Sequence, residues 1–269
     1  MMPKNVFFFL LCCSFSLAAR DNLRLPDVRS MALGGNGVTQ SELYNPSLAA
    51  WAKRRSVQLN YFNRYGMKEL GTVGGSLSLP NRLLPVAFNV CSFGYDAYRE
   101  SMFRASVGKA LNRCWAVGVA FHWSMLETEL YDEPKGRVST DVGIICRPFD
   151  NLSTGLLIMN AVSVHTGDQT TRHKGFVGRM IQLGMEWNVI DNLLITACAG
   201  SGEERAWNGS AGLEYEAFHS FYVRSGVEIN PLMPCFGAGY ELFPFAMDVA
   251  AVYHPVLGVN TGIGITFSF

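Results

Sequence analysis

Charged residues are scarce in this chain, and the positive and negative charges balance. Of 269 residues, 22 are basic and 22 are acidic, so charged side chains make up 16% and the formal net charge is zero. Typical soluble domains contain about 25% charged residues. The sequence therefore offers no basic face for nucleic acid and no polybasic membrane-surface helix, and it is atypical of a soluble helical enzyme.

Long apolar runs are missing after residue 20, which excludes transmembrane helices there, because a helical span needs about 20 apolar residues. Within residues 1–18, Lys4 precedes an apolar stretch over residues 6–17, and the small residues Ala18 and Ala19 follow. This order is typical of a secretory signal peptide, and about 12 apolar residues are too few for a membrane anchor. We predict export, with cleavage near Ala18 or Ala19.

Motifs that carry chemistry are also missing. No Walker loop and no nucleotide-binding glycine motif is present, so we predict no cofactor. No C-x-x-C occurs, and an odd, scattered set of cysteines indicates neither a disulfide framework nor a zinc site. We expect them to serve as small apolar filler. The cysteines that remain after cleavage are Cys91, Cys114, Cys146, Cys198 and Cys235.

Alternation is what the sequence has in abundance, together with 27 glycines and 12% aromatic residues. In the last seven residues, Ile263, Ile265, Phe267 and Phe269 share one face of an extended chain, and small residues occupy the other. A period of two indicates β-strands. The same pattern predicts fourteen strands, near residues 54–64, 68–79, 84–95, 98–111, 114–127, 137–147, 152–163, 177–189, 193–201, 205–215, 219–229, 232–242, 244–253 and 257–269.

The chemistry of the two strand faces distinguishes a membrane barrel from a soluble sandwich. One face is bulky and apolar, whereas the other is rich in Gly, Ala and Ser with scattered carboxylates, as expected for lipid and lumen. Short turns at residues 80–82, 112–113, 150–151 and 191–192 alternate with longer loops near 128–136 and 164–176. We predict an all-β membrane protein, a 14-stranded antiparallel transmembrane β-barrel over residues 54–269.

Residues 19–53 break the alternation. The run VRSMALGGNGVTQSELYNPSLAAW is too long for a frayed end and contains apolar residues that disordered tails usually lack, although a disordered tail is the alternative. We predict that this segment folds into the lumen as a short N-terminal plug.

The segments RSMALGGNGVT and YNPSLAAW resemble the N-terminal signature of FadL-related barrels and, more closely, of the PorV/PorQ-type branch. The plug motif that carries the resemblance comprises Gly34, Gly35, Asn45 and Pro46. Further similarity lies in VSTDVGIICRPFDNLSTGLLIMNAV, in AGLEY with FYVRSGVEINP, and in GAGYELFPFAMDVAAVYHPVLGVNTGIGITFSF. The resemblance implies a plugged, 14-stranded barrel in the outer membrane of a bacterium, surrounded by its lipid.

The same resemblance implies two alternative functions. Members act either as accessory components of type IX protein secretion and surface attachment or in the uptake of apolar molecules. We expect the first, a non-enzymatic accessory or binding component that contacts a secretion translocon barrel or exported cargo proteins. The alternative is a FadL-like transporter for a small hydrophobic ligand.

Strand parity directs a set of charged side chains toward the lumen, where charges are tolerated. We expect these ions to pair with one another and with the plug; a path for polar solutes is the alternative. The set comprises Arg104, Asp141, Glu186, Glu214, Arg224, Glu228, Glu241 and Asp248.

Two further groups contain residue types that occur in functional sites. His122 and Ser124 have the H-x-S spacing of some outer-membrane lipid hydrolases, but their parity follows the small luminal residues, so we predict no catalysis. The two longest loops are the expected surface for a partner, and their His and Asp residues lack the spacing of metal ligands. The partner-loop candidates are Tyr131, Pro134, His165, Asp168, His173 and Phe176.

Overall fold

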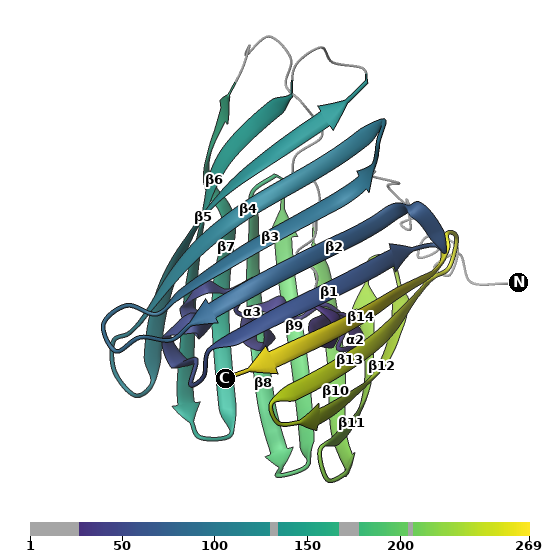
Figure 1. The fold of residues 1–269 in the computed structure, drawn as a ribbon. Helices are drawn as coiled ribbons and strands as arrows, with labels where there is room; N and C mark the ends of the chain where they lie inside the picture. The colour runs from purple at the N-terminus through teal and green to yellow at the C-terminus, as the bar shows by residue number, and fades with distance from the viewer. Residues whose placement is uncertain (1–26, 130–133, 167–177, 204–206) are drawn as a thin grey trace, which may run out of the picture.

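The computed structural model describes residues 27–129, 134–166, 178–203 and 207–269. Fourteen antiparallel strands form a closed barrel in which each strand pairs with its sequence neighbours and β1 pairs with β14 (Figure 1). Closure leaves neither end of the sheet as a free edge. The strands are β1 (Ser56–Arg64), β2 (Met67–Leu79), β3 (Val86–Tyr95), β4 (Tyr98–Ala110), β5 (Trp115–Thr128), β6 (Lys135–Phe149), β7 (Leu152–Thr166), β8 (Met180–Ile190), β9 (Leu193–Gly202), β10 (Asn208–Phe218), β11 (Phe221–Ile229), β12 (Met233–Leu242), β13 (Phe245–His254) and β14 (Gly258–Ser268).

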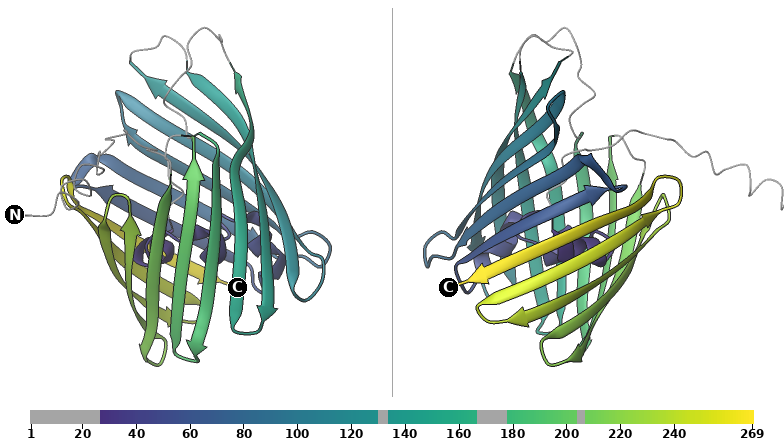
Figure 2. Two further views of the ribbon diagram at one scale, coloured as in Figure 1. Left: turned by 180° about the vertical axis from the view of Figure 1, so that it is seen from behind. Right: turned by 45° about the vertical axis from the view of Figure 1, so that its right-hand side comes forward.

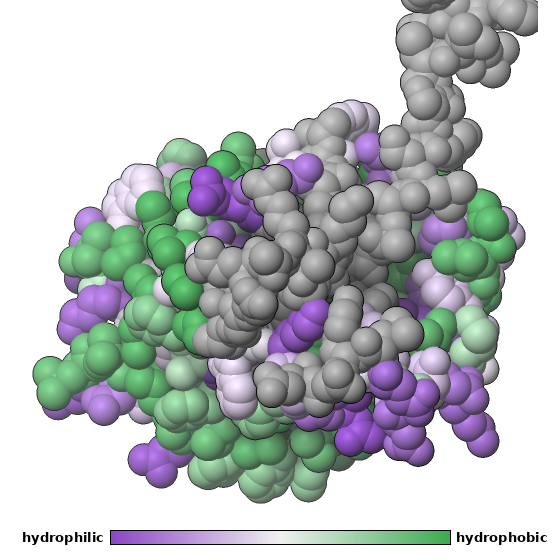
Figure 3. Space-filling view, turned by 90° about the horizontal axis from the view of Figure 1, so that it is seen from above, coloured by the Kyte–Doolittle hydropathy of each residue, from purple (hydrophilic) through white to green (hydrophobic). Residues whose placement is uncertain are grey.

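Alternation along each strand separates an apolar outer face from a small or polar inner face. On β5, Phe121 is 57% exposed and Trp123 45% exposed, whereas Ala120 and His122 between and beside them are buried. Seen from above, hydrophobic residues form much of the outer surface (Figure 3). This distribution is what a lipid-facing barrel requires, and it confirms the predicted fold class.

Three short helical turns form the N-terminal plug: α2 (Val28–Ala32), α3 (Gly37–Gln40) and the 3-10 helix η1 (Pro46–Trp51). They lie inside the barrel (Figures 1 and 2). The helix α2 packs against β11–β14, α3 against β7 and β8, and η1 against β4–β6. The plug therefore crosses the lumen from one wall to the other. Among the described residues, no helix has the length and apolar character needed to cross a membrane.

The two ends of the barrel differ. One end carries the C-terminus and the predicted turns at residues 80–82, 112–113, 150–151 and 191–192, and we call it the short-turn end. The other end also has two-residue connections, at residues 65–66 and 96–97. At the other end, β5, β6 and β7 rise above the rest of the wall (Figures 1 and 2). The expected start of a loop at residue 164 is wrong, because pairing with β6 continues to Thr166 and places His165 in β7. All five cysteines from Cys91 to Cys235 are free thiols.

Candidate functional site

The plug supplies its own helix caps, which a buried segment needs because its backbone groups cannot bond to water. Asp27 accepts hydrogen bonds from the backbone N–H groups at the start of α2, and Asn36 does the same for α3. Asn45 caps η1 through Ser47 N–H, and Pro46 follows at the first helical position. The Asn-Pro pair of the sequence motif is thus a helix start within the lumen.

Two buried asparagines also fasten the plug. The side-chain amide of Asn36 donates to the carbonyls of Met185 and Ala197 on the wall, at 3.3 and 3.4 Å. The side-chain amide of Asn45 donates to Val38 O at 2.8 Å, which joins η1 to α3. Both side chains are fully buried. Each asparagine therefore satisfies a cap and a tertiary contact at once.

A belt of inward-facing glycines lets the plug backbone lie directly on the wall. The glycines are paired across neighbouring strands: Gly108 with Gly118, Gly118 with Gly143, Gly155 with Gly184, and Gly212 with Gly226. A Cβ at Gly226 would lie 2.6 Å from Gly34 N, and one at Gly108 would lie 2.7 Å from Ala50 N. We call this set the glycine belt, with Gly237 included: Gly108, Gly118, Gly143, Gly155, Gly184, Gly212, Gly226 and Gly237.

The glycine pair of the plug motif meets this belt. Gly34 and Gly35 have φ values of 81° and 79°, a left-handed conformation that side-chain-bearing residues rarely adopt. A Cβ at Gly34 would also lie 2.8 Å from Val227 O on β11. Both conformation and space therefore require glycine where α2 ends and the chain turns toward α3.

An ion cluster joins α2 to β10, β11 and β13. Arg29 of the plug makes a bidentate pair with Glu214, at 2.9 and 2.6 Å. Arg224 contacts the same carboxylate from β11 and reaches Asp248 at 2.6 Å. Arg224 and Glu214 are 2% and 6% exposed. The carboxylate of Glu214 is thus shared between one cation of the plug and one of the wall.

A second network joins the plug to the opposite wall. The guanidinium group of Arg104 donates to the plug carbonyls of Leu43 and Tyr44 and to Asp141, at 3.2 Å. Asp141 also accepts the backbone N–H of Asn160 at 2.8 Å. His122 completes the network through Asn160 Oδ1 at 2.9 Å and through Asp141 at 3.4 Å. Every charged member is at most 6% exposed.

Smaller contacts involve the turn between α3 and η1. Gln40 donates to Glu186 at 2.7 Å, and Glu42 accepts from Ser78 at 3.0 Å. Burial raises the pKa of the Glu42 carboxyl above its usual range, and the hydrogen bond from Ser78 opposes that shift. The plug therefore has polar contacts on several sides of the lumen.

The strand β7 bulges beside the Arg104 network. Thr140 pairs with Val162, but Val142 pairs with Ile158, so the extra residues of β7 lie opposite Asp141. Asn160 lies in this bulge with φ of 52°, and its side chain donates to Gly178 O at 3.2 Å.

Most of the luminal ions expected from parity are brought together. Arg104 and Asp141 form one network, Glu214, Arg224 and Asp248 form the other, Glu186 contacts the plug, and Glu228 is buried. For Glu241 the luminal orientation stays a prediction. It lies one residue from the end of β12 and is exposed at the short-turn end.

His122 and Ser124 are both buried on the luminal face. His122 has two partners, Asp141 and Asn160, which spacing along the strand did not reveal. These contacts place His122 in the plug network, away from lipid. Among the partner-loop candidates, Pro134 is exposed and His165 lies in β7. The remaining four, Tyr131, Asp168, His173 and Phe176, lie outside the described residues.

Sequence reasoning missed Arg29, Asn36 and Asn160. The sequence did contain a signal for Arg29. The predicted luminal set has more carboxylates than cations, so a further cation had to come from the plug. The bulge at Asn160 has no comparable signal, since apolar and small residues continue through it. The sequence predicted that small residues occupy the inner face, which includes the glycine belt, but it did not predict that these glycines contact the plug.

Comparison with known proteins identifies the fold. No protein-family model matches the sequence, and no curated protein matches it. The solved structure of the Pseudomonas putida toluene transporter TodX is similar, with 11% identity and a TM-score of 0.61 over 91% of this chain and 98% of that one. The monoaromatic hydrocarbon channel CymD matches with 13% identity and a TM-score of 0.65, over 93% and 99% of the two chains. A Pseudomonas aeruginosa FadL homologue matches with 12% identity and a TM-score of 0.60, over 91% and 97%. The shared feature is the 14-stranded barrel of the FadL type.

The glycine belt can be tested by adding single methyl groups. In Gly118→Ala and Gly226→Ala, the new Cβ would lie 2.6 Å from Pro46 O and 2.6 Å from Gly34 N, so the plug has to shift. We expect both variants to raise conductance in planar bilayers and to expose the plug to protease. Gly75→Ala and Gly209→Ala are matched controls, because their nearest neighbours lie at 3.5 and 3.6 Å. Equal conductance in all four variants would contradict the close fit.

The Arg104 network can be tested through its carboxylate. Asp141→Asn leaves the Arg104 guanidinium buried without a counter-charge, and losing one partner of a buried pair costs about 3–5 kcal/mol. The free energy of unfolding by urea in lipid vesicles measures the loss. Asp96→Asn is the control, since Asp96 pairs with Arg99 at the surface and its loss should change stability little. Similar effects of the two substitutions would show that the buried network is not structural.

Proposed function

We propose that the chain is an outer-membrane channel for small apolar molecules, closed by its N-terminal plug until the plug moves. The observation that carries the proposal is the combination of a FadL-type barrel with a plug that crosses its whole lumen. TodX is described as a toluene transporter and CymD as a monoaromatic hydrocarbon channel, and both have this barrel. The likeness supports uptake over the accessory role that the sequence resemblance implied.

An apolar surface inside the barrel supports the same proposal. Leu43 of the plug packs with Cys91 and Met102 on the inner wall. Phe93 on β3 and Leu126 on β5 face inward and are 3% and 5% exposed. They lie further than Cys91 and Met102 toward the end opposite the short-turn end. The inner face of β3–β5 thus contains large apolar side chains besides the small and charged ones expected. They are nearly fully buried, so an apolar molecule reaches them only when the plug moves.

The bulge of β7 is coupled to the plug through side-chain contacts. It contains Asn160, whose backbone N–H is bound to Asp141. Asp141 also pairs with Arg104, whose guanidinium group donates hydrogen bonds to the plug carbonyls. We infer that the plug and this part of the wall move together.

Type IX secretion is the competing function, and no contact among the described residues favours it. The two functions are separated by isolating the tagged mature protein from native outer membranes in mild detergent. A transporter is recovered as a lone barrel that carries apolar ligand, whereas a secretion component brings a translocon barrel or exported cargo with it.

Movement of the plug can be tested with a disulfide lock. The Cβ of Val28 lies 3.4 Å from the position of a Cβ built on Gly264, close to the spacing of about 3.5–4.5 Å in disulfides. We expect cells that express Val28→Cys/Gly264→Cys to lose uptake of radiolabelled toluene when oxidised and to regain it with a reductant, because the lock holds α2 on β14.

Each single cysteine variant is the control for the lock and should transport in both redox states. Formation of the disulfide is followed by the mobility of the protein on non-reducing gels. Full uptake by the oxidised, locked protein would show that passage does not require displacement of the plug.

A further inference from the structure

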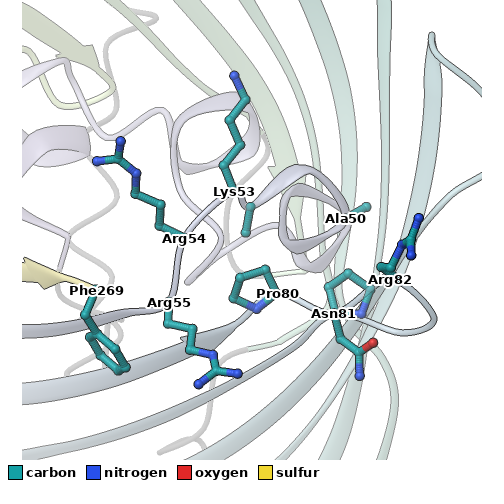
Figure 4. A pocket seen from close by; sticks show the side chains of 10 residues that line it. Ala50, Lys53, Arg54, Arg55, Pro80, Asn81, Arg82 and Phe269 are labelled. Carbon is teal, nitrogen blue, oxygen red and sulfur yellow. The ribbon is translucent and has the colours of Figure 1, made fainter.

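A groove of about 640 Å³ opens at the short-turn end of the barrel, between the end of the plug and the β2–β3 turn (Figure 4). Apart from Ala50 of η1, its lining lies outside the plug interface that the proposed channel uses. Arg55 and Asn81 flank Pro80 in this view, and Arg82 follows Asn81 in the turn. The lining residues are Ala50, Ala52, Lys53, Arg54, Arg55, Pro80, Asn81, Arg82, Pro85 and Phe269.

The groove concentrates uncompensated positive charge. Lys53, Arg55 and Arg82 are exposed, and within the described part of the chain no carboxylate pairs with them. Arg54 lies over the ring of Phe243, at 4.5 Å from the guanidinium carbon to the ring centroid.

The surrounding sector of the rim reinforces this charge. Residues 51–58, 76–88 and 106–118, which form the short-turn end of β1–β5, contain no Asp or Glu. Glu42 of the plug is bonded to Ser78 within this sector, whereas the wall carboxylates Asp150, Asp191, Glu216 and Glu241 of this end lie on the other sector. The chain has no net charge, but its cations and its wall carboxylates lie on different sectors of this rim. This separation creates a local positive potential at the groove.

Apolar side chains next to the groove place it at a membrane surface. Leu83 and Leu84 in the β2–β3 turn are 76% and 47% exposed, and Phe243, Phe245 and Phe269 are each more than half exposed. Exposed aromatic and aliphatic residues at a barrel rim mark the boundary between hydrocarbon and headgroups. The cations therefore lie at headgroup depth, directly beside side chains suited to acyl chains.

We propose that the groove binds the phosphodiester headgroup of an anionic phospholipid in the periplasmic leaflet. Arg55 supplies guanidinium donors to the phosphate oxygens, and Arg82, on the far side of Asn81, adds positive charge. Asn81 Oδ1 accepts from Leu83 N at 3.1 Å, which leaves the Asn81 amide free to donate. The exposed leucines take the acyl chains. This proposal rests on the outer-membrane location in the proposed function, but not on transport.

Lipid is favoured over free phosphate by the apolar neighbours. A soluble phosphate would use the cations alone and would leave Leu83, Leu84 and Phe269 exposed. A phospholipid covers both kinds of surface at once. Leu83 and Leu84 follow Arg82 in the turn and are exposed, so we expect the acyl chains to remain in the bilayer while the headgroup is bound.

Native mass spectrometry of the purified full-length mature protein in detergent tests the proposal. The protein is titrated with dioleoylphosphatidylglycerol, with dioleoylphosphatidylcholine and with glycerol 1-phosphate. We expect one tightly bound phosphatidylglycerol, weaker phosphatidylcholine, and little glycerol 1-phosphate. Arg55→Ala/Arg82→Ala should weaken phosphatidylglycerol by at least about tenfold, because charge-assisted hydrogen bonds are lost.

Lys68→Ala/Arg99→Ala is the matched control, since it removes the same number of exposed cations at the opposite end of the barrel. It should bind like the wild type. Equal affinity for the two lipids, or no difference between the two double variants, would overturn the proposal. Glycerol 1-phosphate binding as tightly as the lipid would assign the groove to a free phosphate ester instead.

Folding and transport are measured separately. Heat-modifiable mobility on gels shows whether each variant is a folded barrel, and binding that weakens with rising salt in the folded wild type supports an electrostatic site even if Arg55→Ala/Arg82→Ala misfolds. Salt-independent binding would overturn it. Toluene uptake should be unchanged in the folded groove variant, so a failure of the channel proposal leaves lipid binding intact.

Discussion

The structure depends on one constraint, the close approach of the plug backbone to the inner wall of the barrel. A barrel of about eight strands is filled by its own side chains, and a 14-stranded one is wider. Here the chain fills that width with residues 27–51, and glycines on the wall bring the two backbones together. Because no water can satisfy a buried backbone, Asp27, Asn36 and Asn45 cap the turns from within.

The glycine belt lets the plug approach the wall, and ion pairs between plug and wall fix its position there. Buried ion pairs contribute little net stability, because desolvation offsets their attraction, but a partner that is missing costs much more. The plug is therefore held best in the one position where Arg29 meets Glu214 and the carbonyls of residues 42–44 meet Arg104. Such contacts are specific without being irreversible. In the proposed channel, where the plug has to move for a small molecule to pass, the contacts need this combination.

Much of the fold could be predicted from the sequence, because lipid and lumen impose opposite requirements on alternate residues. That alternation located all fourteen strands, and its parity found the luminal ions Arg104, Asp141, Glu214, Arg224 and Asp248. It could not show which ions meet, since Arg29 and Glu214 are far apart in the sequence.

The remaining errors have local causes. The bulge at Asn160 leaves the alternation of neighbouring residues almost undisturbed, and continued pairing extends β7 beyond the predicted loop start. Function was harder to predict than the fold, because the sequence resemblance pointed first to secretion. The apolar inner residues Phe93 and Leu126 could be recognised only once the fold was known.

The most direct measurement of the central claim is the single-channel conductance of the mature protein with and without residues 27–51. If the plug alone closes the lumen, the full chain is silent in planar bilayers, and the deletion variant opens persistent, large conductance steps while remaining a folded, heat-modifiable barrel. A folded deletion variant as silent as the full chain would contradict the account, because the wall itself would then close the lumen.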